Sequence, residues 1–247
     1  MITFPEINNV YLMPNPNGRL FPDICFRLTK INWIEKEYER ILDSLEVETA
    51  FNENIELIKD PELFLFLLKP YPLNHLTLSA MGFSKVGNSY SKHIKNGSGN
   101  FFTVELLWDN GSYKLNGVEI EENKKNRLTN IFSLDELQVQ VRHCLKTELP
   151  INIITCNHAI CLMFSTNDYI NAIYKAMLYN NMRCYYKWLP EILRDNALFA
   201  MPDADISLIT GYLIQMNVFE LNHDEMGEQY LMIHKSIKKH VRRRGNE

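Results

Sequence analysis

The placement of glycine divides this chain into parts with different folding preferences. Six of the ten glycines lie between residues 82 and 117, and none occurs between residues 118 and 210. Glycine readily adopts the positive φ that many turns need, and it weakens the interior of a helix. We therefore expect residues 82–117 to be rich in β-structure and residues 118–210 to be mostly helical.

Two β-hairpins are predicted in the glycine-rich part. The letters FFTVELLW, DNGS and YKLNGVEI follow one another over residues 101–120 and predict two strands joined at Asn110–Gly111. The preceding SKVGNSYSKHI, residues 84–94, fits a shorter hairpin. Together these segments predict a small antiparallel sheet.

Helical periodicity dominates the second half of the chain. Ser133 and Glu136 have the spacing of a capping box ahead of an apolar stripe, and Pro150 ends the pattern. Between Pro150 and the next helix, INIITCN fits a strand, and HAICLMF fits a continuation of that strand or the beginning of a helix, because periodicity does not decide between them. We predict helices over residues 133–147, 165–181, 184–196 (interrupted by or starting at Pro190), 203–217 and 222–244.

The N-terminal part gives a helix and an extended segment. INWIEKEYERILDSLEVE, residues 31–48, predicts an amphipathic helix that buries Trp33, Tyr38, Ile41 and Leu45. Ahead of it, three prolines within nine residues favour an extended conformation, so residues 1–22 are interpreted as an arm rather than a packed element. Such an arm is a leading loop or a segment that lies across a neighbouring subunit.

These predictions amount to an α+β fold. It has an N-terminal arm and helices, a small antiparallel sheet with a capping helix, and a mostly α-helical C-terminal half. The expected domains are the extended arm (1–22), an α+β domain (23–150) and a helical domain (151–247).

Composition narrows the class of protein. The 247 residues are 46% hydrophobic and 23% charged, as in globular proteins. The five scattered cysteines suit reduced thiols better than a disulfide framework. The N-terminus lacks the pattern of a signal peptide, and the longest strongly apolar run, LFLFLL at 63–68, is too short to span a bilayer. We expect a cytoplasmic or virion protein that is neither secreted by a signal peptide nor embedded in a membrane.

Candidate metal or catalytic residues are few. Cys156, His158 and Cys161 lie close in sequence, near His143 and Cys144, yet they lack the paired knuckles of a zinc site. We interpret the thiols as core residues; a metal site, or a Cys156–His158 nucleophile and base, are the alternatives.

Acidic residues also have two interpretations. Asp203 and Asp205 could hold a divalent cation, but carboxylates are expected at the start of a helix. Asn222 and Glu225 have capping-box spacing. The chain contains none of the sequence motifs for phosphate loops, dinucleotide binding or common hydrolases, so we expect no cofactor and favour a protein that is not an enzyme.

The C-terminal tail concentrates positive charge. The whole chain has a net charge of −4, but the part outside residues 235–244 carries −10. These cations form a solvated helix end, which the helix dipole favours, or they contact nucleic acid or an acidic partner. The candidate contact residues are Lys235, Lys238, Lys239, Arg242, Arg243 and Arg244.

Residues 76–149 combine two segments whose residue pattern also occurs in other proteins. The segment LTLSAMGFSKVGNSYSKH, a β-hairpin and IFSLDELQVQVRHCLKTEL together resemble an uncharacterised module common in Bacteroidetes genomes and their phages. The matching positions are Leu78, Gly82, Phe83, Tyr90, Leu137, Gln138, Leu145, Glu148 and Leu149. Where the module has His-Gln this chain has Asp135–Glu136, and where it has an aromatic run this chain has VQVRH. The resemblance implies a phage or mobile-element origin and supplies no catalytic residues.

Two functions follow as expectations. The first is a non-catalytic structural or assembly protein, such as a phage virion component of the head-to-tail connector type, with protein neighbours as partners and a homo-oligomeric state. The second is a nucleic-acid-associated protein of a mobile element, either a regulator or a metal-dependent enzyme, that contacts DNA through the basic C-terminal segment.

Overall fold

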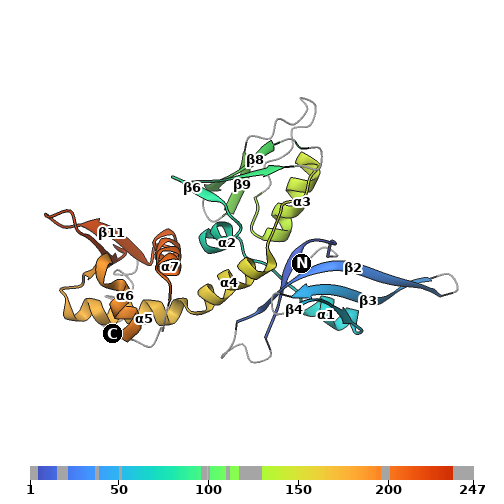
Figure 1. The fold of residues 1–247 in the computed structure, drawn as a ribbon, viewed down its shortest axis with the longest axis horizontal. Coiled ribbons are helices and arrows are strands. Elements are labelled where there is room, and N and C mark those ends of the chain that lie inside the picture. The colour runs from blue at the N-terminus through green and yellow to red at the C-terminus, as the bar shows by residue number, and fades with distance from the viewer. Residues whose placement is uncertain are drawn as a thin grey trace, which may run out of the picture. The chain divides into compact units, whose positions relative to one another are not determined.

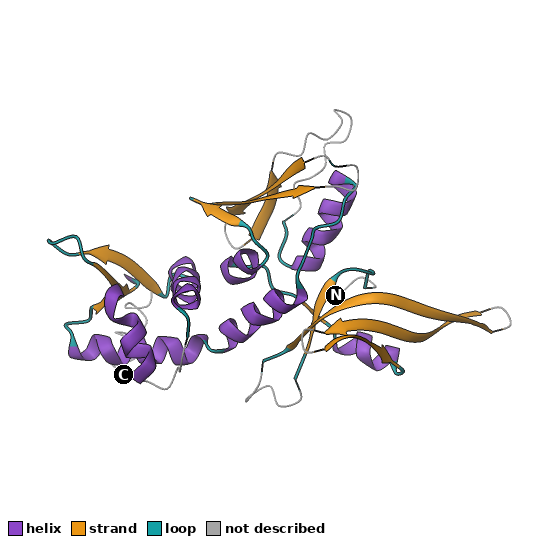
Figure 2. Ribbon diagram, in the orientation of Figure 1, coloured by secondary structure: helices purple, strands orange, loops and turns teal. Residues whose placement is uncertain are grey.

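The computed structural model describes residues 5–15, 22–36, 39–49, 52–95, 99, 101–109, 112–116, 130–195 and 201–235. Within these residues the chain has the expected α+β class, with three antiparallel sheets and most of its helices between residues 134 and 215 (Figures 1 and 2). The chain divides into two compact units, residues 1–160 and 161–247. None of the helices in the described ranges has the length and apolar character needed to cross a bilayer.

The N-terminal unit contains a five-stranded antiparallel sheet in the order β4-β3-β2-β1-β5. Its strands are β1 (Val10–Met13), β2 (Ile24–Lys36), β3 (Glu39–Thr49), β4 (Asn52–Ile58) and β5 (Lys69–Pro70). One face packs on α1 (Pro61–Leu67), where the rings of Phe26 and Phe64 have centroids 4.9 Å apart. The buried core on this face consists of Tyr11, Phe26, Leu28, Leu45, Val47, Phe64 and Leu68.

Two predictions for this sheet are wrong. Residues 31–48 form parts of β2 and β3 instead of a helix: Leu45 is buried as expected, but Trp33 and Ile41 are 37% and 40% exposed, and Tyr38 lies outside the described residues. The cause is tertiary pairing, because Leu45 and Val47 alternate toward the same core as residues of β2. The expectation that residues 1–22 remain unpacked fails at β1, whose Val10, Tyr11 and Leu12 are buried.

The second sheet is the one predicted from the glycine-rich segment. Both predicted hairpins are confirmed as four strands in the order β6-β7-β8-β9, although Asn110 and Gly111 of the expected turn lie outside the described residues. The strands are β6 (Ser84–Val86), β7 (Ser89–Lys95), β8 (Phe101–Asp109) and β9 (Ser112–Asn116). Two helices of the same unit are α2 (His75–Ala80) and α3 (Leu134–Leu145).

Helix α3 begins where the sequence predicts. The Ser133–Glu136 capping box is present, and the Glu136 carboxylate accepts a hydrogen bond from the backbone N–H of Ser133 at 3.3 Å. The helix ends before Pro150, because Lys146 adopts a left-handed conformation with φ of 50°. The buried residues of α3 are Leu134, Leu137, Gln138 and Val141.

The boundary between the two units falls within α4 (Ile153–Phe164), so the ambiguous HAICLMF segment is helical and INIITCN is helical from Ile153 onward. The C-terminal unit continues with α5 (Thr166–Tyr179), β10 (Cys184–Tyr185), α6 (Leu189–Asp195), α7 (Asp203–Gln215), β11 (Phe219–His223) and β12 (Gln229–Ile233). Helices α5 and α7 match their predicted positions. The predicted helix over 184–196 is confirmed only in part, because β10 and a short 3-10 turn precede α6, which has Pro190 in its first turn.

The predicted last helix over residues 222–244 is wrong within the described residues. Residues up to Ile233 form the β11–β12 hairpin instead, and Asn222 and Glu225 make no capping box. Its turn is built by Asp224, whose carboxylate accepts hydrogen bonds from the backbone N–H groups of Met226 and Glu228, both at 2.9 Å. Gly227 supplies the positive φ of 80° that this turn requires.

Candidate interaction surfaces

The far half of the β2–β3 hairpin extends beyond its neighbouring strands. Strand β1 pairs with β2 only at residues 24–27, β4 pairs with β3 only at residues 45–49, and no other described strand pairs with either. Residues 30–36 and 39–44 therefore form a two-stranded ribbon, roughly 20 Å long at ~3.3 Å per residue (Figure 1). The two edges of such a ribbon offer backbone N–H and C=O groups to an added strand.

Apolar side chains lie on both faces of this ribbon. Trp33 is opposite Leu42 and Ile34 is opposite Ile41; because successive side chains of a strand alternate, the two pairs lie on opposite faces. Ile34 and Ile41 are 42% and 40% exposed, and the Arg40 guanidinium lies 5.0 Å from the centre of the Trp33 ring. A two-stranded hairpin is only marginally stable in water, so a ribbon of this composition gains from being covered by another surface.

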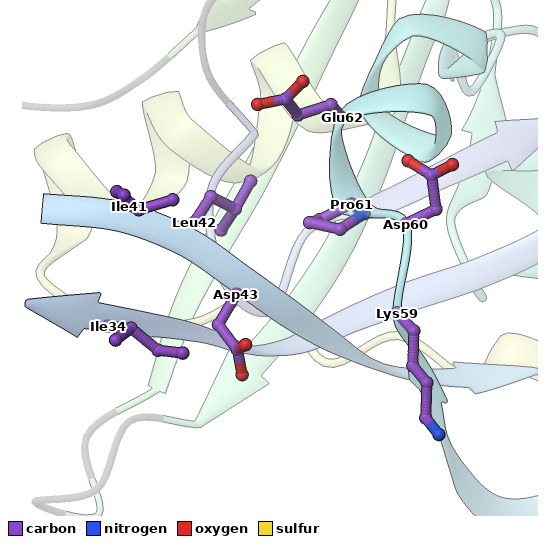
Figure 3. A pocket seen from close by; sticks show the side chains of 8 residues that line it. All are labelled: Ile34, Ile41, Leu42, Asp43, Lys59, Asp60, Pro61 and Glu62. Carbon is purple, nitrogen blue, oxygen red and sulfur yellow. The ribbon is translucent and has the colours of Figure 1, made fainter. Parts of the chain in front are cut away.

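A pocket of about 440 Å³ opens beside the ribbon (Figure 3). The strands contribute Ile34, Ile41, Leu42 and Asp43, and the start of α1 contributes the segment 59–62. Apolar groups from the strands thus meet Lys59 and three carboxylates, those of Asp43, Asp60 and Glu62. The lining is therefore part apolar and part acidic, and it includes no His, Cys or Ser.

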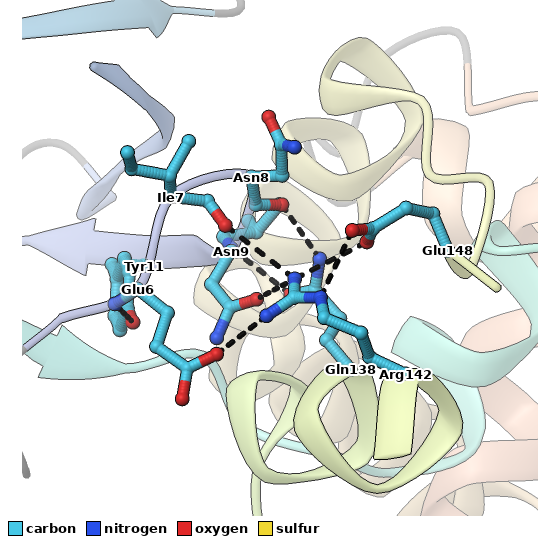
Figure 4. A network of polar contacts seen from close by, with 9 residues as sticks. Glu6, Ile7, Asn8, Asn9, Tyr11, Gln138, Arg142 and Glu148 are labelled. Atoms are coloured by element: carbon cyan, nitrogen blue, oxygen red, sulfur yellow. Dashed lines mark hydrogen bonds and ion pairs between the residues drawn. The ribbon is translucent and has the colours of Figure 1, made fainter. Parts of the chain in front are cut away.

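A polar network fastens the N-terminal segment to α3 (Figure 4). Arg142 contacts Glu6 at 2.5 Å, Glu148 at 2.9 Å and the Asn9 side chain at 3.0 Å. Next to it, buried Gln138 accepts a hydrogen bond from Val10 N–H at 3.0 Å and donates one to the Asn8 carbonyl at 2.8 Å. These contacts satisfy backbone groups beside the start of β1, so we assign the network to folding.

The cysteine-rich segment of α4 does not converge on a site. Cys156 is fully buried, whereas His158, two positions later, is exposed, as expected for helical side chains about 200° apart. A hydrogen bond from the Cys25 thiol lowers the pKa of the Cys156 thiol against the effect of burial, and Tyr71 O–H donates to the Cys156 carbonyl at 2.9 Å. In the described part of the chain, no three His, Cys, Asp or Glu side chains group closely enough to hold a metal ion.

The C-terminal unit has the element order of a winged helix-turn-helix domain. A helix (α5) is followed by a strand (β10), two helices (α6 and α7) and a two-stranded hairpin, and its sheet has the order β10-β12-β11. In DNA-binding domains of the helix-turn-helix class, the second helix of the motif enters the major groove. The equivalent element here is α7.

Negative charge dominates α7 and the β11–β12 turn, the elements that would face a DNA groove in a helix-turn-helix arrangement. No lysine or arginine occurs between Arg194 and Lys235, a stretch with seven carboxylates. Asp203 and Asp205 lie in the first turn of α7, where the helix dipole favours them, and no metal-binding group forms around them within the described residues. Repulsion between these carboxylates and phosphates opposes direct reading of DNA by α7 or by the β11–β12 turn.

The basic tail begins immediately after β12. Lys235 is exposed. The remaining candidate contact residues, Lys238, Lys239, Arg242, Arg243 and Arg244, lie outside the described residues. Other exposed cations of this unit lie before α7; among them, Lys187 pairs with Glu228 at 3.1 Å.

The chain matches no family model, no curated protein and no solved structure. Sequence reasoning missed the ribbon because it interpreted residues 31–48 as a helix. The β-branched and aromatic residues of TKINWI, residues 29–34, are the local signal that favours a strand there.

Proposed function

We propose that this chain is a non-catalytic assembly protein whose β2–β3 ribbon engages protein neighbours, including other copies of the chain. The observation that carries the proposal is the ribbon itself, with two open edges and the apolar pairs Trp33–Leu42 and Ile34–Ile41 on its two faces. Adding a strand to such an edge satisfies backbone groups while it covers apolar surface. A virion component of the head-to-tail connector type is the specific setting that the resemblance in residues 76–149 suggests.

The test alters the ribbon without altering the core. Ile34→Thr combined with Ile41→Thr keeps β-branched side chains in both strands and removes apolar surface from one face. Val86→Thr is the matched control, because Val86 is 75% exposed at a distance along the chain from the ribbon. Deleting residues 1–22 is unsuitable, since it would remove buried β1.

Sedimentation velocity and hydrogen–deuterium exchange then measure assembly. We expect the wild-type chain to sediment faster as its concentration rises, with amides of residues 39–44 becoming protected at the same time. The double threonine variant should lose the protection of residues 39–44 and sediment more slowly than the wild type at the same concentration, and the Val86→Thr control should behave as the wild type does. Amides of residues 39–44 that exchange at the same rate at every concentration up to ~100 µM would contradict the proposal.

A second candidate function is contact with nucleic acid through the basic tail. The winged helix-turn-helix order of the C-terminal unit favours it, while the carboxylates of α7 and the β11–β12 turn restrict the contact to Lys235 and the cations that follow. Such binding should weaken steeply with salt, and replacing Arg242, Arg243 and Arg244 by Ala should flatten that dependence. Failure to bind a 30-base-pair DNA duplex in 20 mM salt would exclude this function.

A further inference from the structure

The outer face of α5 carries several exposed side chains in the described part of the C-terminal unit. The inner face of this helix buries Tyr169, Ala172, Ile173 and Met177 against the rest of the unit. On the opposite side, Phe164, Tyr174 and Leu178 are 41%, 42% and 57% exposed. A helix whose second face also carries large apolar side chains has a surface suited to a partner.

Three exposed residues on this side repeat at the heptad spacing. Phe164, Asn171 and Leu178 are spaced seven residues apart, which places them on one line along the helix. Ser165 is a turn residue between α4 and α5; its N–H donates to the Cys161 carbonyl at 3.1 Å, and Tyr169 N–H donates to the Ser165 carbonyl at 3.2 Å. Phe164, the last residue of α4, is therefore next to the N-terminal end of the α5 stripe.

Charges beside this stripe complement each other when two copies run antiparallel. With Asn171 opposite Asn171 of the second copy, Phe164 meets Leu178 of the other copy. The same register sets Asp168 against Lys175 of the other copy, twice by symmetry. Asp168 and Lys175 are both exposed, and neither forms an ion pair with another described residue. A two-fold interface must be self-complementary in this way.

We propose that α5 is a homodimerisation helix that packs antiparallel against α5 of a second copy, with Asn171 at the two-fold axis. The opposed asparagines fix the register, as a single polar layer does in coiled coils. The α5 surface and the β2–β3 ribbon are formed by different residues, so either contact can exist without the other. If both contacts exist, a dimer through α5 would present two ribbons for further assembly.

Charge exchange across the two-fold axis provides the test. In a homodimer of Asp168→Lys, lysine faces Lys175, and in a homodimer of Lys175→Asp, aspartate faces Asp168; each repulsion should weaken dimerisation about tenfold or more. Mixing the two variants restores two opposite-charge pairs, so the mixture should dimerise as the wild type does. Asp195→Lys is the control for charge alone, because Asp195 is exposed at the end of α6 and is not part of the stripe.

Analytical ultracentrifugation of the full chain measures the result, with far-UV circular dichroism as a check on folding. We expect the wild type and the Asp195→Lys control to reach at least twice the 29.0 kDa chain mass, each single charge variant to have a lower mass than the wild type at the same concentration, and the mixture to recover the wild-type mass. A wild type that stays at one chain mass up to ~100 µM, or a mixture that associates no better than its components, would overturn the proposal.

The ribbon variant Ile34→Thr/Ile41→Thr separates the two contacts. If the α5 proposal is correct, this variant still dimerises and its dimer still responds to charge exchange. Loss of the dimer in the ribbon variant, together with indifference to the charges on α5, would reject the α5 interface while leaving the ribbon contact in place.

Discussion

The hydroxyl groups of Tyr169 on α5 and Thr210 on α7 lie 2.5 Å apart inside the C-terminal unit. Thr210 also donates to the Ile206 carbonyl at 2.7 Å, so the Tyr169 hydroxyl is the donor between the two side chains. Both residues are buried, and burial raises the pKa of Tyr169, which keeps the phenol protonated as a donor. This bond connects α5 with α7 inside the C-terminal unit.

Removing that hydroxyl should loosen the C-terminal unit. Tyr169→Phe leaves the ring in place but takes the donor from Thr210, so the free energy of unfolding should fall by about 1–2 kcal/mol. Urea unfolding would measure the change in this free energy, and faster hydrogen exchange of the α7 amides would locate it in the C-terminal unit. Tyr174→Phe, on the exposed face of α5, is the matched control and should change the value by less than ~0.5 kcal/mol; equal effects of the two variants would refute this assignment.

Gln138 should matter more than its neighbour Gln140. Gln138→Leu would leave the Val10 N–H and the Asn8 carbonyl without their buried partner, at a cost of about 2–3 kcal/mol. Gln140 is two positions further along α3 and only half-buried, so Gln140→Leu should lower the free energy of unfolding by less than ~0.5 kcal/mol. Faster proteolysis of the segment before β1 in the first variant, and not in the second, is the expected readout.

Acid should destabilise the N-terminal unit through His75. Burial, and to a smaller extent Lys85, lowers the pKa of His75 to about 4, and its Nδ1 lies 3.0 Å from the Tyr90 hydroxyl. Between its ordinary pKa of about 6.5 and pH 4, the unfolded chain binds a proton that the folded chain does not. Stability should therefore be complete above pH 6.5 and fall as the pH drops toward 4.

The variant His75→Gln isolates this contribution, because glutamine can accept from Tyr90 but cannot be protonated in this range. The wild type should lose more of its urea midpoint than the variant does between pH 6.5 and 4. Parallel pH profiles for the two proteins would show that His75 is not responsible.

Gly82 closes α2 in a conformation that other residues resist. Its φ is 79°, and Phe83 N–H donates to the Leu78 carbonyl at 3.0 Å, a helix-end pattern that favours glycine. Gly82→Ala should destabilise the N-terminal unit by about 1 kcal/mol, whereas Gly82→Asn should cost less because asparagine tolerates positive φ. Thermal unfolding of both variants would test the order, and an alanine variant as stable as the wild type would contradict it.

Local signals predicted the elements that depend on local contacts. The capping box of Ser133 and Glu136 is formed by residues three positions apart, so the start of α3 could be read from the sequence. The hairpin of β8 and β9 likewise needs only a turn between two alternating runs. In both cases the information lies within a few residues of the element it specifies.

The failures occur where the partner is distant or the pattern is ambiguous. Residues 31–48 contain good helix formers, and their apolar residues also fit a helical stripe; pairing of β2 with β3 and packing on Phe64 of α1 override that preference. For β11 and β12, the turn residues Asp224 and Gly227 were the signal, but the helical spacing of Met226, Tyr230 and Ile233 obscured it. The ribbon and the α5 stripe could not be recognised as surfaces until the buried faces were known.

The open edges of the ribbon, residues 30–36 and 39–44, have a consequence for how the protein can be expressed. Open strand edges can pair with those of other newly made copies, so under the proposed assembly function the solubility of the chain should depend on a partner that covers the ribbon. Expressed without such a partner, the chain should collect in inclusion bodies. Co-expression of the partner from the same transcript should return the chain to the soluble fraction.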